Sequence, residues 1–218
     1  MYSSIADAPE NLIPGLYWRA TNHSYYLFSR PVIERINNRE LLEVIMHRIN
    51  SLNPDYYYGG TSRFFGRLYT RLPGVDISKS EQYFNQAILL DPSNTALLYN
   101  LANCLFNAND FKQSIKVCQK IINIDPAFHF AYNRIGLCFV QLGIDAEAKK
   151  FFEKAVKINP DYVEGLNNYG FILQKERNYS LASVQFEKAL SINPNSDEAV
   201  TNLCKAYFDE GQLSKAIE

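Results

Sequence analysis

A phrase that ends in proline returns along the chain at a fixed interval of 34 residues. The phrases ILLDP, INIDP, VKINP and LSINP end at Pro92, Pro126, Pro160 and Pro194. Apolar residues spaced three and four apart within this interval are typical of helices, so the repeat predicts one helix pair per unit. Each proline is expected to stop the second helix, because it lacks a backbone N–H and restricts the residue before it. The period therefore predicts stacked helix pairs that cover one another's apolar surface.

Small residues recur at fixed places within these units. If units are counted from residues 95, 129, 163 and 197, the eighth positions are small: Ala102, Gly136, Gly170 and Cys204. A second small residue follows twelve positions later: Ser114, Ala148, Ala182 and Ala216. Small side chains let two antiparallel helices approach closely, so these positions predict where paired helices touch. Gly143 and Gly211 fall in the predicted turn between the helices, where a left-handed backbone is useful.

This pattern resembles the tetratricopeptide repeat (TPR) family. The residues that carry the resemblance recur one unit on, and in unit 129–162 they are Gly136, Phe139, Ala148, Phe152, Ala155 and Pro160. The resemblance implies an all-α fold, a right-handed α-α superhelix (a TPR solenoid) of about six helix pairs. Its regular part spans residues 95–218, as units 95–128, 129–162, 163–196 and a partial unit 197–218.

The first third of the chain is less regular. After a flexible N-terminus over residues 1–12, two irregular helix pairs are predicted within residues 13–92. The first comprises helices near 13–29 and 38–52, and the second comprises helices near 60–72 and 76–90. We expect these pairs and the regular units to form one continuous solenoid.

Two segments of this N-terminal part, GLYW and NPDYYYGGTSRFFGRLYTRLPG, are distinctive. They are similar to bacterial TPR proteins related to the T component of TRAP transporters. The matching residues are Tyr17, Trp18, Tyr58, Gly59, Gly60, Arg63, Gly66, Arg67, Tyr69, Pro73 and Gly74. That resemblance implies a periplasmic accessory protein that offers a groove or pore to partners and small ligands.

Charge and motif content argue against several function classes. The net charge of −1 lacks the basic excess of most nucleic-acid binders, and no apolar run is long enough to insert into a membrane. The histidines, His23, His47 and His129, are scattered and form no HExxH motif, so no metal site is predicted. Phosphate-binding and nucleophile motifs are absent as well. We therefore expect a protein that is not an enzyme and has no cofactor.

The four cysteines do not form a CxxC pair. They occupy repeat positions that are expected to pack, where cysteine behaves as a small hydrophobe: Cys104, Cys118, Cys138 and Cys204. Four free thiols favour a reducing compartment. Because no signal peptide is visible, a cytoplasmic location is predicted, and a periplasmic one is the alternative if a signal segment was removed.

The TPR resemblance implies that the first helix of each pair lines a concave groove. Its candidate peptide-binding residues are mostly aromatic or carboxamide: Tyr99, Asn103, Phe106, Phe130, Asn133, Leu137, Asn167, Phe171 and Lys205. Carboxamides can hydrogen-bond a peptide backbone, and aromatic rings supply apolar area, so a protein or peptide partner is predicted. For Phe106 and Phe208, packing between repeats is an equal alternative. The lysines of a basic carboxylate clamp are missing, which argues against an acidic C-terminal tail as the ligand.

A second candidate site, for an anion or small organic ligand, comprises Tyr58, Gly59, Gly60, Arg63 and Arg67. Arg63 and Arg67 are four residues apart and share a helix face, which suits a carboxylate or phosphate. Their alternative role is pairing with nearby acids. The glycines, expected just before a helix, could cradle an anion or simply form a tight turn.

Two further expectations concern the shape of the site and the C-terminus. A cavity enclosed by Tyr17, Trp18, Tyr58 and Arg63 would favour the small ligand, whereas an open groove would favour a peptide. The last unit stops at Glu218, early in its second helix. Terminal repeats normally need a polar cap, so this pair is expected to fray, to self-associate by docking on a second copy, or to belong to a longer chain.

Overall fold

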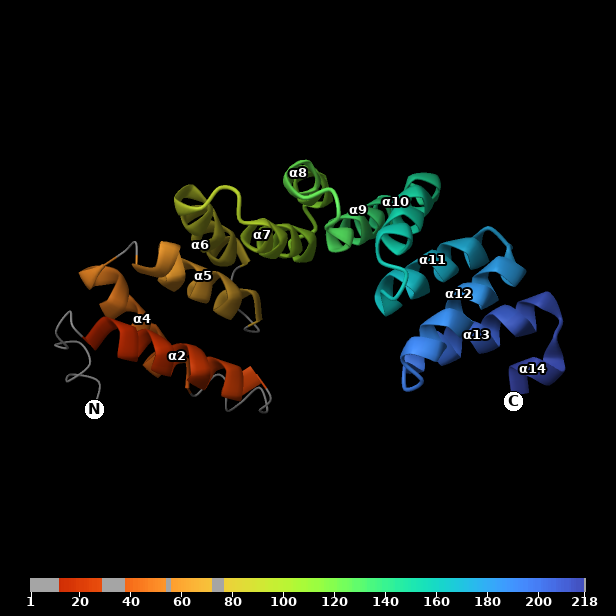
Figure 1. The fold of residues 1–218 in the computed structure, drawn as a ribbon, viewed down its shortest axis with the longest axis horizontal. Coiled ribbons are helices and arrows are strands. Elements are labelled where there is room, and N and C mark those ends of the chain that lie inside the picture. Colours follow the sequence, from red (N-terminus) through yellow and green to blue (C-terminus); the bar gives the residue numbers. More distant parts are fainter. Residues whose placement is uncertain (1–11, 29–37, 54–55, 72–76, 218) are drawn as a thin grey trace. The chain divides into compact units, whose positions relative to one another are not determined.

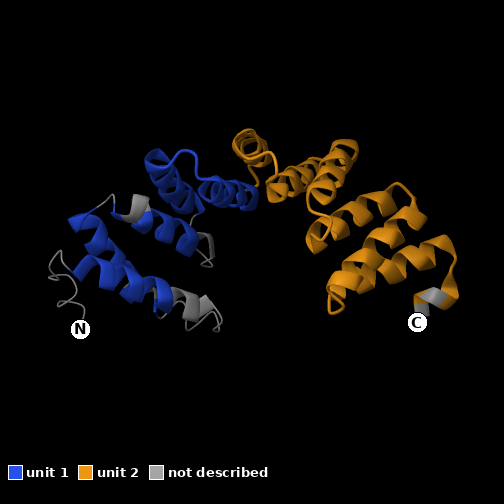
Figure 2. Cartoon of the chain, viewed as in Figure 1, with its two compact units in different colours: residues 1–108 blue, residues 109–218 orange. Residues whose placement is uncertain are grey.

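The computed structural model describes residues 12–28, 38–53, 56–71 and 77–217 (Figure 1). The regular structure within these ranges is α-helical and contains no strand, in agreement with the predicted all-α TPR solenoid. Residues 1–11, most of the predicted flexible N-terminus, lie outside the described residues. The chain divides into two compact units, residues 1–108 and residues 109–218 (Figure 2). The division falls inside the predicted repeat 95–128, so the single continuous solenoid stays a prediction.

Unit 1 contains α2, α4, α5, α6 and α7, and each described helix packs on the next one along the chain. Their bounds are Ile13–Phe28, Arg39–Leu52, Tyr56–Arg71, Ile77–Leu90 and Thr95–Asn107. Three of these helices, α2, α4 and α6, lie within one residue of their predicted limits, but α5 begins four residues earlier than predicted. The core forms where apolar faces of α2, α4 and α5 meet, and it includes Leu42, Met46 and Ile49 of α4.

Unit 2 contains the helices from α8 to α14. In chain order, α8 spans Phe111–Ile124, α9 His129–Gln141, α10 Asp145–Ile158, α11 Val163–Lys175, α12 Tyr179–Ile192, α13 Asp197–Glu210 and α14 Leu213–Ile217. α9 pairs with α10 and α11 pairs with α12, as the 34-residue period predicts. The first helices of successive pairs, α9, α11 and α13, also contact one another in that order.

The small residues lie where paired helices approach most closely. A Cβ atom at Gly136 would lie 2.5 Å from the ring of Phe152, and one at Gly170 would lie 2.6 Å from the ring of Phe186. Both distances are too short for a real contact, so these rings occupy the space that the glycines leave. The predicted role of the eighth position is therefore confirmed in these two pairs.

The phrases before the prolines form capped turns between units. Asp125, Asn159 and Asn193 each accept, through side-chain Oδ1, a hydrogen bond from the backbone N–H two residues later. This local bond satisfies a backbone donor that the ended helix cannot use, and the intervening proline has no donor of its own. The recurrence of Asp-Pro or Asn-Pro is thus explained by the turn that each unit needs before the next helix.

A left-handed backbone recurs at the fifteenth position of every unit. Gly143 and Gly211 have φ angles of 73° and 84°, as predicted for the turn between paired helices. Asn109 and Arg177 occupy the same position and have φ angles of 61° and 62°. Asparagine tolerates this region, whereas arginine carries a steric cost because of its Cβ.

Replacing Arg177 with glycine is therefore expected to stabilise the chain by about 1 kcal/mol, because glycine adopts positive φ without that cost. Urea denaturation followed by circular dichroism measures the change. Arg177→Ala is the matched control, because it removes the same side chain but keeps the Cβ. An equal gain in both variants would mean that the side chain, and not the backbone, is the source of strain.

Candidate functional site

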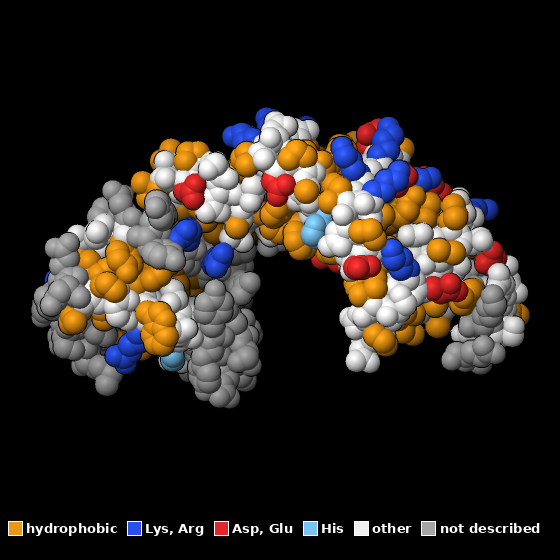
Figure 3. Space-filling view, viewed as in Figure 1, with side chains coloured by type: hydrophobic (Ala, Val, Ile, Leu, Met, Phe, Trp, Pro, Cys, Tyr) orange, Lys and Arg blue, Asp and Glu red, His pale blue; other side chains and the backbone are white. Residues whose placement is uncertain are grey.

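The candidate peptide site in unit 2 is formed by three parallel rows of side chains. We call it the A-helix face and define it by the second, fifth and ninth positions of α9, α11 and α13. Its members are Phe130, Asn133 and Leu137, then Glu164, Asn167 and Phe171, then Glu198, Thr201 and Lys205. Figure 3 shows hydrophobic side chains interspersed with charged ones over unit 2.

Hydrogen bonds through Asn133 tie α9 to α11. The Asn133 side chain is fully buried, and its Nδ2 donates to the hydroxyl of Tyr162 and to Oε1 of Glu164, both at 3.0 Å. Its Oδ1 accepts from Nδ2 of Asn168 at 2.9 Å. Both ends of this amide are thus used within the fold. Asn133 therefore positions Glu164 rather than presenting its own amide on the surface.

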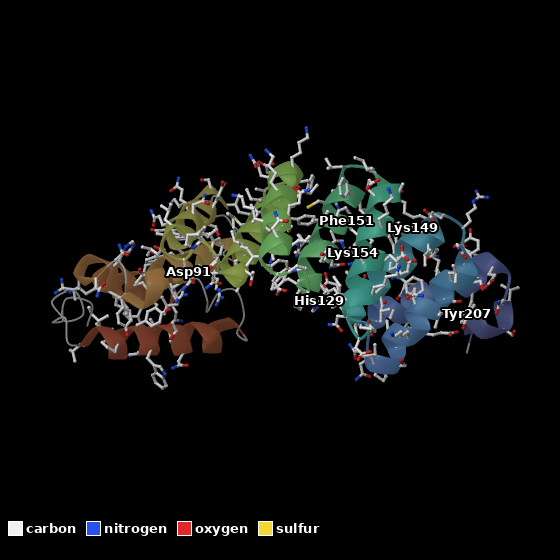
Figure 4. The ribbon with its side chains drawn as sticks, turned by 45° about the horizontal axis from the view of Figure 1, so that its top comes forward. Asp91, His129, Lys149, Phe151, Lys154 and Tyr207 are labelled. Atoms are coloured by element: carbon white, nitrogen blue, oxygen red, sulfur yellow. The ribbon has the colours of Figure 1, made fainter. Side chains whose placement is uncertain are left out.

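Aromatic rings gather at the start of α9. The ring of His129, labelled in Figure 4, lies 4.0 Å from that of Phe130 and 4.8 Å from that of Tyr162, centroid to centroid. Burial lowers the pKa of His129 below its ordinary value, so the ring is neutral near pH 7. Nδ2 of Asn159 lies 3.2 Å from Nε2 of His129, and a neutral ring can accept this hydrogen bond. The cluster leaves Phe130 on the surface, with 38% of the residue exposed.

The described candidates of unit 2 differ in exposure. Phe171 is 42% exposed, and Lys205 is also exposed, so both can meet a partner. Asn167 is only 2% exposed, and Leu137 is half-buried and packs against the core of α10 and α11. The face is thus made of exposed rings and charges around two buried amides.

The other predicted peptide-binding residues, Tyr99, Asn103 and Phe106, lie on α7 in unit 1. All three are half-buried there. Phe208 on α13 is exposed, so packing between repeats does not cover its ring among the described residues.

The lysines beside the A-helix face are partly neutralised by acids. Nζ of Lys175, at the end of α11, lies 2.5 Å from Oδ2 of Asp145, and Nζ of Lys149 lies 2.5 Å from Oε2 of Glu176. Nζ of Lys154 on α10, a residue labelled in Figure 4, lies 4.8 Å from the centre of the Tyr132 ring. These contacts join α10 to its neighbours. The three lysines therefore pair with groups other than the acids of the A-helix face.

The second candidate site, in unit 1, differs from its predicted form. Gly59 and Gly60 lie inside α5, and not in a turn before a helix. Close packing explains why residue 60 of this helix is glycine, because a Cβ there would lie 2.8 Å from the hydroxyl oxygen of Tyr17. The arginines of the site also differ: Arg63 is half-buried and Arg67 is exposed on α5. The side chain of Tyr58 lies outside the described residues.

The suggested cavity in unit 1 does not include Trp18, which is 71% exposed on α2. Instead, Glu43 accepts a hydrogen bond of 2.7 Å from the hydroxyl of Tyr69. Phe65, Tyr69 and Tyr83 form a packed group of rings beside it. Burial and the nearby Glu43 carboxylate raise the pKa of Tyr83. This part of unit 1 is therefore a filled aromatic core, and sequence reasoning had not identified it.

Three of the four cysteines are buried as expected, but Cys204 is exposed. In repeats 129–162 and 163–196, a ring of the second helix covers the eighth position, whereas α14 has only five residues. Burial raises the pKa of the Cys118 thiol to about 12 and also raises that of Cys138. These thiols are therefore protonated and shielded in the folded state.

We expect a thiol reagent such as 5,5′-dithiobis(2-nitrobenzoate) to modify one cysteine in the folded chain and all four after denaturation. Cys204→Ser should abolish the reaction in the folded state, and Cys104→Ser should not change it. Rapid modification of Cys104, Cys118 or Cys138 in the native chain would show that the packing around them opens.

The described residues contain no group of three or more His, Cys, Asp or Glu side chains that could hold a metal ion. Among the described helices, none combines the length and apolarity needed to cross a bilayer.

Sequence comparison decides the family. The model of the TRAP transporter T-component family matches residues 2–132, which is more than half of the chain. The chain belongs to the TRAP transporter T-component family. Two tetratricopeptide repeat models match further along the chain, at residues 129–162 and 163–196. Both predicted resemblances are therefore confirmed, and the two repeats coincide with the predicted units. A search of curated proteins finds no match.

Solved structures similar to this chain are TPR proteins. PilF of Pseudomonas aeruginosa has a TM-score of 0.71 at 15% identity, with 94% of this chain and 90% of that chain covered. YrrB, described as a TPR protein with an unusual peptide-binding site, has a TM-score of 0.58 at 19% identity, with 84% and 89% covered. The first TPR of Spaghetti (RPAP3), bound to the HSP90 peptide SRMEEVD, has a TM-score of 0.53 at 21% identity, with 56% and 96% covered. At these identities, the likeness shows the fold alone.

Proposed function

We propose that the chain is a non-enzymatic scaffold that binds a protein or peptide segment on the A-helix face. The observation that carries the proposal is the exposure of Phe130 and Phe171 beside the buried network of Asn133. Large exposed rings are typical of the energetic centres of interfaces. The network fixes the backbones that hold them, so little conformational entropy is lost on binding. Two structures of the same fold support this proposal: the RPAP3 repeat bound to a peptide, and YrrB with its peptide-binding site.

A pull-down from lysate tests the proposed function. The baits are the wild type and the double variant Phe130→Ala/Phe171→Ala. The matched control is Leu181→Ala/Val184→Ala, which removes two exposed apolar side chains from α12. We expect a protein that the wild type and the control retain and the Phe130/Phe171 variant loses. Equal retention by all three baits would contradict the A-helix face, and no specific retention by any would contradict a scaffold role.

Membership of the T-component family favours a second candidate function, an accessory protein that binds a small organic ligand through α5. Arg63 and Arg67 are four residues apart on this helix, and Arg67 is exposed. Arginine forks bind carboxylates and phosphates through paired hydrogen bonds. We expect a panel of small carboxylates and phosphates to contain a compound that raises the melting temperature of the wild type but not of Arg67→Ala. Equal shifts in both proteins would contradict this site.

A further inference from the structure

Three neighbouring residues of α11 lie on one face of the helix and offer a ligand different chemistry. Glu164, Asn167 and Phe171 are separated by three and four residues, so their side chains project in the same direction. Glu164 is an exposed carboxylate, and Phe171 is an exposed ring. Asn167 between them is 2% exposed, and its Oδ1 has no hydrogen-bond partner in the part of the chain that the structure describes.

The repeat shows why this unpartnered oxygen is unusual. Asn133 and Asn167 occupy the same position in successive units, one 34-residue step apart. Oδ1 of Asn133 accepts a hydrogen bond from Asn168. The residue equivalent to Asn168 in the next unit is Asn202, and the corresponding bond to Asn167 is not formed. A buried acceptor without a partner is costly, so a donor supplied by a ligand would be favourable there.

The carboxylate of Glu164, next to Asn167 on the same face of α11, is also an acceptor. Oε1 of Glu164 accepts a hydrogen bond from Asn133, which fixes the carboxylate and leaves Oε2 for a ligand. The A-helix face carries no Lys or Arg on α9 or α11, and the nearby Lys175 is paired with Asp145. On α13, the face adds the exposed carboxylate of Glu198 and one cation, Lys205. A ligand that complements this arrangement must bring hydrogen-bond donors and positive charge.

We propose that the A-helix face selects a peptide with an arginine or lysine side chain next to an apolar residue. The cation binds Oε2 of Glu164 and lies against the exposed ring of Phe130, where a cation–π contact adds to the ion pair. A peptide N–H donates to Oδ1 of Asn167, and the apolar residue packs on Phe171. The inference rests on the proposed function, since it names the partner chemistry of that same face.

Selection from a phage-displayed library of random dodecapeptides tests the proposal. The immobilised baits are the full-length wild type, Glu164→Gln and Glu153→Gln. Glu153 is a matched control, because it makes the same change of charge on α10, away from the A-helix face. Far-UV circular dichroism checks that both variants melt as the wild type does, as expected for exchanges of surface carboxylates.

We expect arginine and lysine to be enriched beside apolar residues in the peptides retained by the wild type and by Glu153→Gln. Glu164→Gln should lose this enrichment. For a synthetic peptide from the wild-type selection, Glu164→Gln should raise the Kd about tenfold or more, the usual effect of losing a charge-assisted hydrogen bond. Glu153→Gln should leave the Kd within about twofold.

Two other outcomes are distinguishable. Peptides retained without basic enrichment, or with the same enrichment on Glu164→Gln, would overturn the inference and leave the scaffold function standing. No specific peptide retained by any bait would overturn both.

Discussion

Replacing Phe152 with alanine is expected to lower the free energy of unfolding by about 3–5 kcal/mol, the usual cost of removing a large aromatic ring from a packed core. Phe152 is buried between α9 and α10, and its ring fills the space over Gly136. Alanine would leave a cavity there, because Ala148 and Ile172, which belong to the same apolar cluster, are too small or too far from Gly136 to fill the space of the ring. Urea denaturation monitored by circular dichroism at 222 nm measures the change.

The control for this experiment is Phe171→Ala, which removes the same ring from an exposed site. Because the ring of Phe171 is partly solvated, its removal is expected to cost less than about 1 kcal/mol. Equal losses from the two substitutions would place Phe171 in the core. That result would remove one of the two rings on which the proposed binding face depends.

Gly136→Leu is expected to destabilise the chain by about 3 kcal/mol or more, at the upper end of the range for overpacked cores. The leucine Cβ alone would lie 2.5 Å from the Phe152 ring, and the rest of the side chain needs still more room. The ring cannot move away easily, because it is enclosed by both helices of the pair. α9 and α10 must therefore separate, which also weakens the contact of α10 with α11.

Gly15→Leu provides the matched control, because a Cβ at Gly15 on α2 meets nothing within 4 Å. Leucine also has a higher helix propensity than glycine, so this variant should be unchanged or slightly more stable. Chemical denaturation of both variants under the same conditions compares them directly. A loss below about 1 kcal/mol in Gly136→Leu would contradict the close helix contact that defines the repeat.

The period predicted the helix pairs well because their determinants are local. The proline phrases, the glycines of the close contacts and the turn glycine Gly143 all act within one unit, so they recur visibly in the sequence. The left-handed conformation of Arg177 follows from the same period, although its residue type gives no signal. The place of a residue in the repeat thus predicted the left-handed turn at Arg177, which its amino-acid type did not.

The site was less predictable because it depends on contacts between distant segments. Asn133 was expected to face a peptide, but its partners Glu164 and Asn168 come from the next unit. Gly60 was expected in a turn, but it lies within α5, where Tyr17 of α2 packs against it. Neither contact leaves a pattern within a short stretch of sequence. The unpartnered Oδ1 of Asn167 also depends on the following unit, because within the described residues it receives no bond like the one that Asn168 donates to Asn133.

The most direct test of the proposed binding face is photo-crosslinking. The photoreactive amino acid p-benzoylphenylalanine replaces Phe171 on the A-helix face in one protein and Val184 on α12 in another, since both side chains are exposed. Each protein is irradiated in lysate, and crosslinked partners are identified by mass spectrometry. We expect a partner to be crosslinked from position 171 and not from position 184. A partner captured from position 184 alone, or equally from both positions, would contradict it.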